Sequence, residues 1–377
     1  MRIEQYQWFP DRGWNAEFGV SDKAQIAFVF GSLKAVTSSD VFQRVRDAYP
    51  AAHAFGCTTA GEIHGQSVDD ETVSVSAVKF EHSRVTTSSV SMLRREDSFM
   101  SGEKLAQSFA MNGLKHVFVL SVGIEVDGSE LVAGVNSRLP DHVTVSGGLA
   151  GDFDRIERTL VWCDGIPMES SVVAVGFYGE QLRVGLAADG GWDPFGPERL
   201  VTRSVGNVLY ELDGRSALAL YKQYLGEHAA GLPTSGLLYP LGLSVAGSDK
   251  KVLRSLISVD EEQQSLTFAG DVPERSMARL HVGNVERLTE GASRAAAAST
   301  SHLGGVAAEF AILVSCYGRR PILRQLADEE VEAAAEGLGD SAKIAGFYSY
   351  GEICPAARDH RAELHNQTMT ITSFAEL

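Results

Sequence analysis

The sequence predicts an α/β protein built from repeated strand–helix–strand units, which form layered mixed or antiparallel sheets with outer helices in two related halves. Three observations support this prediction. A glycine-rich turn followed by an acidic residue occurs three times; each copy follows an apolar run and a stretch with helical periodicity; and each copy precedes another strand pattern. Three copies in the same order are hard to produce by chance, so the repetition decides the architecture.

The turn is clearest near the two ends of the chain, as Phe55-Gly56-Cys57-Thr58-Thr59-Ala60-Gly61-Glu62-Ile63 and as Gly346-Phe347-Tyr348-Ser349-Tyr350-Gly351-Glu352-Ile353. A shorter copy, Gly147-Gly148-Leu149-Ala150-Gly151-Asp152, has aspartate in place of glutamate. Glycine permits positive φ and close backbone approach, so we predict tight turns at one sheet edge. The three acids then either face a shared cleft or cap local N–H groups.

The periodicity assigns the elements in order. Strands are expected at 26–31, 117–120 and 310–314, helices at 40–49, 129–138 and 329–338, and closing strands at 72–80, 171–177 and 368–374. Two further helices are expected at 217–225, capped by Asp213 or Ser216 and ended by Gly226, and at 285–300. The turn-rich stretch 190–197 predicts a boundary near residue 195, and so two domains, 1–195 and 196–377.

Composition and charge exclude several classes of protein. The chain of 377 residues is 44% hydrophobic and 22% charged, as expected of a globular protein. Its 33 basic and 49 acidic residues give a net charge of −16, which disfavours nucleic acid and anionic lipid as partners. No signal peptide or membrane-spanning segment is recognisable, and the four cysteines form no C-x-x-C pair. We therefore expect a cytoplasmic protein with free thiols and no membrane insertion.

Several motifs resemble the FIST family. Residues 55–63 and 148–152 resemble the N-terminal FIST domain; residues 202–221, 315–319, 346–353 and 365–368 resemble the C-terminal FIST domain. Together they cover nearly the whole chain in the expected order. The resemblance implies an intracellular sensory or signal-transduction protein with a small-ligand site. Some bacterial members are haem-based nitric-oxide sensors that control a partner histidine kinase.

A haem group needs an axial histidine, cysteine, methionine or tyrosine in an apolar pocket. No C-x-x-C-H motif is present, so the haem would be non-covalent haem b. His365, in a motif that resembles the family beside the last turn, is the first choice for the iron ligand, and His64 is the second. Each is equally explained as a surface or hydrogen-bonding histidine.

Cys57 follows the first glycine of its turn, where backbone N–H groups would lower its thiol pKa. With His53 or His365 as base it would give a thiol-dependent enzyme, and Glu62 a carboxylate-dependent one. No orienting third group is recognisable, and a packed, buried cysteine is the alternative.

Arg319 ends an apolar strand and either binds an anionic ligand group or pairs with Glu352 or Asp152. Tyr348 and Tyr350 suit polar ligand contacts or a half-buried aromatic strand. The candidate ligand-binding residues are Gly56, Cys57, Thr58, Thr59, Gly61, Glu62, Asp152, Arg319, Tyr348, Tyr350, Gly351, Glu352 and Asn366.

The favoured function is a ligand sensor without catalytic residues that acts on a signalling partner such as a histidine kinase. Its ligand is haem with nitric oxide, or an amino acid or other small metabolite. A homo-oligomer is left open.

Overall fold

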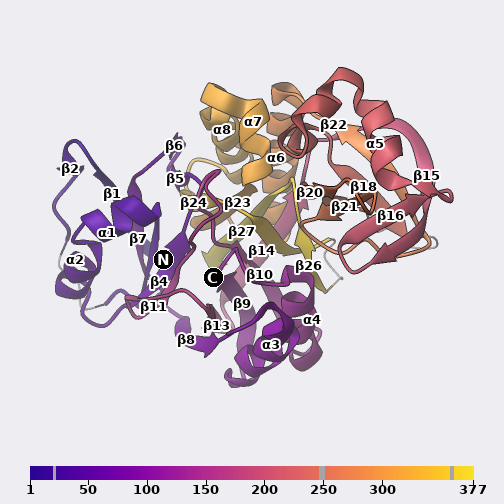
Figure 1. Ribbon diagram of the computed structural model, residues 1–377. Coiled ribbons are helices and arrows are strands. Elements are labelled where there is room, and N and C mark those ends of the chain that lie inside the picture. Colours follow the sequence, from indigo (N-terminus) through magenta and orange to yellow (C-terminus); the bar gives the residue numbers. More distant parts are fainter. Residues whose placement is uncertain (20–22, 246–250, 357–360) are drawn as a thin grey trace.

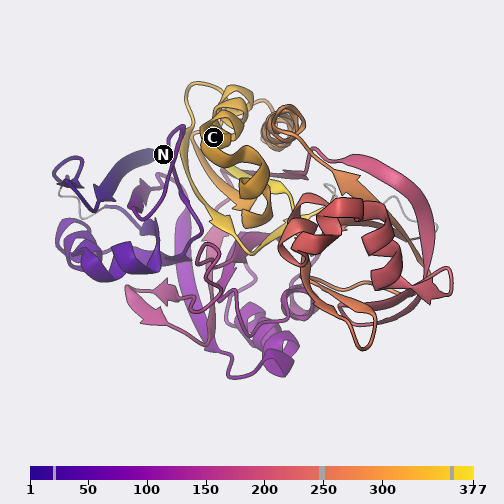
Figure 2. The ribbon, with the colours of Figure 1, turned by 45° about the horizontal axis from the view of Figure 1, so that its top comes forward.

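The computed structural model of the chain describes residues 1–19, 23–245, 251–356 and 361–377. Three related α/β units, coloured indigo, purple and yellow-orange, surround a common centre, and a β-rich domain is inserted beside the third (Figure 1; Figure 2). The predicted α/β class and its repeated unit are confirmed. The terminal ammonium of Met1 lies 3.8 Å from the Glu376 carboxylate, so the two ends of the chain lie side by side.

Each unit is centred on two parallel strands joined by a helix, with a third strand antiparallel to the first. In unit one these elements are β3 (Ile26–Gly31), α2 (Val41–Ala48), β4 (His53–Thr58) and β7 (Val73–Lys79). In unit two they are β9 (Leu114–Ser121), α4 (Gly128–Arg138), β10 (Thr144–Leu149) and β13 (Ser171–Tyr178). In unit three they are β23 (Phe310–Cys316), α8 (Ala327–Leu338), β24 (Lys343–Ser349) and β27 (Met369–Glu376).

Each unit also extends a hairpin into the sheet of another unit. The hairpins are β5 (Glu62–His64) with β6 (Ser67–Asp69), β11 (Val161–Cys163) with β12 (Ile166–Met168), and β25 (Gly351–Pro355) with β26 (Ala362–His365). Strand β5 pairs with β24, β11 with β4, and β25 with β10, so the exchange closes a ring. The outer sheet edges are β1 (Arg2–Phe9) followed by β2 (Gly13–Trp14), β8 (Arg84–Ser91) and β14 (Leu182–Asp189).

The inner faces of the three sheets share one aromatic core. The ring of Phe28 lies 6.3 Å from that of Phe118 and 5.7 Å from that of Phe310, which joins all three units. Helices cover the outer faces: α2 in unit one, α3 (Ser98–Gln107) with α4 in unit two, and α6 (Val285–Ser301) with α8 in unit three. Central strands covered on both faces explain the continuous apolar runs in the sequence.

The inserted domain occupies the chain between β14 and α6 and contains an eight-stranded sheet. Its strands are β15 (Asp193–Val205), β16 (Val208–Leu212), β17 (Arg215–Ser216), β18 (Leu241–Val245), β19 (Lys251–Arg254), β20 (Leu256–Asp260), β21 (Ser265–Phe268) and β22 (Ser276–Val282). Helix α5 (Ala217–Leu225) lies where the sequence predicts it, and Ser216 Oγ caps it by accepting from Ala219 N at 3.1 Å. Asp213 instead accepts from Leu200 N in a strand turn.

The expected division near residue 195 falls inside β15, and it stays a prediction. Units one and two precede this strand, whereas unit three and most of the inserted domain follow it. In the described part of the chain, the remaining short α-helices are α1 (Leu33–Ser38) and α7 (Arg320–Leu323). Within the described ranges, no helix has the length and apolar character required to cross a membrane.

Candidate functional site

The three glycine-rich turns follow β4, β10 and β24 and meet one another. We call residues 58–62, 149–152 and 348–352 the turn junction. Three backbone hydrogen bonds link the turns: Ala60 N to Tyr348 O at 2.8 Å, Gly151 N to Thr58 O at 3.0 Å, and Tyr350 N to Leu149 O at 3.2 Å. The three turns therefore meet through their backbones. That they form a shared cleft stays a prediction.

The first glycine of each turn is needed for strand packing. A Cβ added to Gly56, Gly147 or Gly346 would lie 1.8, 1.8 or 2.0 Å from a carbonyl oxygen of the neighbouring parallel strand. A real Cβ cannot approach oxygen so closely, so only glycine fits at these positions. The repeated glycines are thus explained by backbone packing without any ligand.

The two glutamates of the turns make the same local contacts. Glu62 accepts hydrogen bonds from the Thr59 hydroxyl and from the Thr72 amide and hydroxyl, the latter two at 2.9 and 2.8 Å. Glu352 accepts from Ser349 Oγ at 2.7 Å and from the Thr368 amide and hydroxyl at 3.3 and 3.0 Å. Both carboxyl groups are fully buried, and desolvation raises the pKa of each to about 8. This geometry matches the capping alternative.

Asp152, the acid of the shorter turn, is held differently. Its Oδ2 accepts from the backbone N–H of Arg158 at 3.4 Å, and the half-exposed Arg155 guanidinium lies 3.8 Å from its Oδ1. Asp152 therefore does not make the contacts that Glu62 and Glu352 share.

Arg319 is fully buried and forms its ion pair with Glu330 rather than with Glu352 or Asp152. Its Nε and Nη2 both contact Glu330. The remaining N–H groups donate to the carbonyl oxygens of Gly190 at 2.5 Å, Gln367 at 3.0 Å and Leu288 at 3.1 Å. All five donors of the guanidinium are used, which leaves none for an anionic ligand.

Among the predicted ligand-binding residues, the two tyrosines have hydrogen-bond partners and the asparagine has none among the described residues. Tyr348 donates to Glu330 Oε2 at 2.7 Å, and Tyr350 donates to the Phe153 carbonyl at 2.9 Å. Asn366 is fully buried, and neither polar atom of its amide has a hydrogen-bond partner among the described residues. An unsatisfied buried amide is rare in native proteins, which makes Asn366 unusual within the predicted set.

The surroundings of Cys57 disfavour a nucleophile. Its thiol is fully buried in the aromatic core, and desolvation raises its pKa well above the usual range. The proposed base His53 instead contacts Asp164, with Nδ1 2.6 Å from the carboxylate.

The two histidines predicted as haem-iron ligands, His365 and His64, each make a polar contact through a ring nitrogen. His365 is 4% exposed, and its Nε2 lies 2.9 Å from the Cys354 carbonyl oxygen. His64 Nδ1 lies 3.1 Å from Ser74 Oγ, and Asp69 is a charged neighbour, so its setting is polar. An axial ligand requires a nitrogen directed into an apolar slot.

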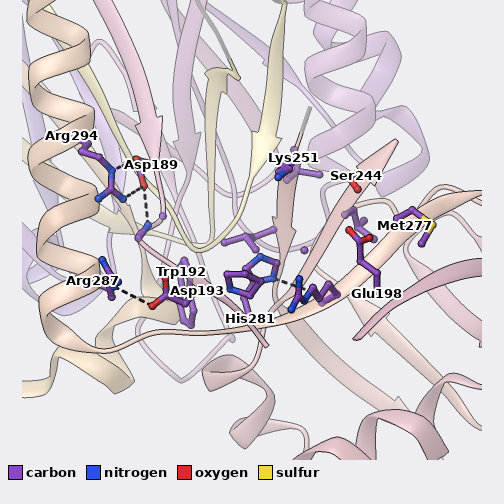
Figure 3. A pocket seen from close by; sticks show the side chains of 18 residues that line it. Asp189, Trp192, Asp193, Glu198, Ser244, Lys251, Met277, His281, Arg287 and Arg294 are labelled. Carbon is purple, nitrogen blue, oxygen red and sulfur yellow. Dashed lines mark hydrogen bonds and ion pairs between the residues drawn. The ribbon is translucent and has the colours of Figure 1, made fainter. Parts of the chain in front are cut away.

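A pocket of about 380 Å³ lies between unit three and the inserted domain (Figure 3). We call it the seam pocket. One wall is formed by residues 189–194 and by Arg287 and Arg294 of α6; the floor is one face of strands β18, β19 and β22. Its volume is in the range of small-molecule sites. None of the ligand-binding residues predicted from the sequence lines it.

Two arginines of the wall are already paired. Arg294 makes two contacts with the Asp189 carboxylate, at 2.8 and 3.0 Å, and Arg287 Nε lies 3.1 Å from Asp193 Oδ2 (Figure 3). Both arginines also pair with Glu290 on α6, at 2.9 Å from Arg287 and 3.8 Å from Arg294. These ion pairs join α6 to the segment that enters the inserted domain.

The floor and rim of the pocket carry charged side chains that can form further hydrogen bonds or ion pairs. Arg279 Nε donates to the Gly196 carbonyl at 2.7 Å, while its four terminal N–H groups have no partner among the described residues. In the same described part of the chain, neither Lys251 nor Glu198 forms an ion pair, and both are exposed.

His281 forms a flat part of the floor. Its ring covers Gly242, where an added Cβ would lie 2.1 Å from the imidazole Cε1. Nδ1 lies 3.1 Å from the Arg279 carbonyl oxygen, and this contact assigns the proton to Nδ1 and a lone pair to Nε2. Burial lowers the pKa of His281, which keeps the ring neutral near pH 7.

The seam pocket and the turn junction are connected by hydrogen bonds. Trp192 in the pocket wall donates from Nε1 to the Gln367 carbonyl at 2.7 Å, and Arg319 donates to the same oxygen and to Gly190. Through Glu330, Arg319 is joined to Tyr348 in the turn junction. The predicted residue Arg319 therefore supports the pocket wall from behind.

The sequence carries a signal for this pocket at residues 276–282, which the predicted strands do not include. The turn-rich stretch 190–197, which predicts a domain boundary, forms part of the pocket wall. Within residues 276–282, Met277, Arg279 and His281 alternate with buried residues, a period-2 pattern that identifies both the strand and its solvent face. Among the described residues, no group of three or more potential metal ligands is present.

The structure is that of an α/β protein with an open pocket of about 380 Å³. Residues 25–215 match the FIST N domain and residues 217–355 match the FIST C domain. The chain therefore belongs to the FIST family, a family of sensory and signal-transduction proteins.

Two further similarities are distant. Uncharacterized protein MJ1623 of Methanocaldococcus jannaschii is 24% identical over 216 residues, which cover 54% of this chain and 41% of the relative. The chain thus matches less than half of that relative's length. A crystal structure of cyanuric acid hydrolase from A. caulinodans aligns with 78% of this chain and 99% of that chain at 12% identity and a TM-score of 0.18. So low a score supports no statement about the fold.

Proposed function

We propose that this protein is a sensor that binds a small metabolite in the seam pocket and transmits its presence to a signalling partner. The observation that carries the proposal is the pocket itself, since it combines a volume of about 380 Å³ with polar groups that have spare hydrogen-bonding capacity. Membership of a sensory family supports the same conclusion.

The position of the pocket supports a signalling role. Its two sides belong to the inserted domain and to unit three, so a ligand that contacts both sides favours one relative placement of them. The contacts of Trp192 and Arg319 join this seam to the turn junction. A histidine kinase or another signalling protein is the proposed receiver, and the protein acts in the cytoplasm.

A thermal-shift screen with a metabolite library tests the proposal. Ser244, on the floor of the pocket, is replaced by phenylalanine to fill the site, and the matched control is Ser258→Phe on the exposed strand β20. We expect library members that raise the unfolding temperature of the wild type and of Ser258→Phe but not of Ser244→Phe. Ligands that stabilise all three proteins equally, or no ligand at all, would overturn the proposal.

A haem-based sensor is the second candidate, and one observation favours it. His281 has its Nδ1 held by a backbone carbonyl, an arrangement common in metal-ligating histidines, and its Nε2 has no partner among the described residues. Bound haem would supply an iron for nitric oxide, and His281 and Arg279 are the pocket residues that would hold the group. The many charged side chains of the lining count against an apolar macrocycle, so this candidate ranks second.

Spectroscopy distinguishes the two candidates. Titration of the purified protein with haem should give a Soret band that shifts with nitric oxide and is lost in His281→Ala if haem is the ligand. His64→Ala, outside the pocket, is the control. A spectrum of unbound haem with the wild type leaves only the metabolite sensor.

A further inference from the structure

We infer that the ligand of the seam pocket is a small organic carboxylate, held by the terminal N–H groups of Arg279, that also carries a hydrogen-bond donor for Nε2 of His281. This inference rests on the proposed function and specifies the chemistry of its ligand.

The guanidinium of Arg279 is prepared for a bidentate contact. Its Nε donates to the Gly196 carbonyl at 2.7 Å, which restrains the plane of the guanidinium group. Its terminal N–H groups have no partner in the described part of the chain. A restrained arginine fork matches the two oxygens of a carboxylate and loses little entropy on binding.

The charges of the pocket favour a monoanion. The two wall arginines pair with three carboxylates, those of Asp189, Asp193 and Glu290. The other charged residues that line the pocket are Arg279, Lys251 and Glu198. Among the described residues, the charges at the pocket therefore cancel, in a protein whose net charge is −16. A carboxylate adds one negative charge to this site, whereas a phosphate dianion adds two and is repelled more strongly.

The floor specifies the rest of the ligand. Arg279, Gly242 and Leu253 lie opposite one another on β22, β18 and β19, so their side-chain positions share one face. Gly242 leaves room there for the His281 ring. A ligand bound to Arg279 therefore lies over the neutral imidazole of His281, which offers a lone pair. The far end of this ligand contacts the apolar side chain of Leu253. An N–H or O–H group on the ligand would satisfy that lone pair.

The ligands found in the thermal-shift screen provide the test, because the library contains carboxylates, phosphates, amines and neutral compounds in equal numbers. Each carboxylate is compared with its primary amide, and inorganic phosphate is tested alone. Binding is measured by calorimetry to the wild type, Arg279→Gln, Lys251→Gln and the control Arg203→Gln, whose arginine pairs with Glu211 outside the pocket.

We expect carboxylates to dominate the ligands, with Arg279→Gln weakening them about 10- to 100-fold, Lys251→Gln about 2- to 5-fold, and Arg203→Gln not at all. Amides should bind at least about 10-fold more weakly than their acids. Ligands that are mainly amines, phosphates or neutral compounds, or carboxylates indifferent to Arg279→Gln, would overturn the inference while the sensor function stands. No ligand of any class would overturn both.

Discussion

The buried carboxyl groups of Glu62 and Glu352 make stability depend on pH in a direction opposite to that of most acidic residues. Burial raises their pKa from 4.5 to about 8 in the folded protein, while the unfolded chain ionises near 4.5. Between these values the folded state holds one more proton per carboxyl. The stability that these two carboxyl groups contribute is therefore fully present below about pH 4.5 and is lost as the pH rises towards 8.

Between pH 6 and pH 9, linkage gives a loss of about 3 kcal/mol for each carboxyl. The double variant Glu62→Gln/Glu352→Gln removes this loss, because a glutamine oxygen still accepts from the Thr72 or Thr368 amide and its NH₂ donates to the Thr59 or Ser349 hydroxyl. Urea unfolding at several pH values measures the difference. We expect the variant to match the wild type near pH 6 and to exceed it by several kcal/mol near pH 9.

The exposed residue Glu17 supplies a control, since Glu17→Gln should leave the pH profile of the wild type unchanged. If the double variant loses stability with rising pH as steeply as the wild type, the two carboxyls are not protonated in the folded protein and the reasoning fails.

Three further predictions concern the residues behind the pocket and in the turns. Arg319→Ala should lower the free energy of unfolding by about 3–5 kcal/mol, because it leaves Glu330 buried without a cation. Arg203 is exposed, so the control Arg203→Ala should change the urea midpoint little, and equal effects of the two variants would contradict the prediction. Gly346→Ala should cost about 1–3 kcal/mol or more in the same assay, because its methyl would lie 2.0 Å from Leu313 O, and an unchanged midpoint would argue against the close approach. Iodoacetamide should alkylate Cys57 far more slowly in the native protein than in urea, and rapid native labelling would show an accessible thiolate.

The local order of the chain was predictable from the sequence because it depends on short-range patterns. The stretches 26–31 and 217–225 coincide with β3 and α5, and the three turns lie where their glycines occur. In these cases apolar periodicity and helix caps act within a few residues, so no knowledge of distant contacts is required.

The partners of the candidate residues were not predictable in the same way. Glu330 lies on a helix surrounded by other acids, and nothing local shows that it turns inward to Arg319. The seam pocket combines Asp189, Arg279 and Arg294, which three separate elements bring together. The pairing of β5 with β24 joins two segments nearly three hundred residues apart, and a three-residue strand carries too little pattern to specify it.

The exchange of hairpins means that the two family domains are not independent building blocks. A fragment ending near residue 195 would keep β10 but lose the β25–β26 hairpin that pairs with it, and the complementary fragment would keep β24 without β5. Each fragment would display an unpaired inner edge of a kind that promotes aggregation. Co-expression of the two pieces should therefore give soluble material where either piece alone does not, and a displacement of β5 or β25 would act directly on a strand of the other half.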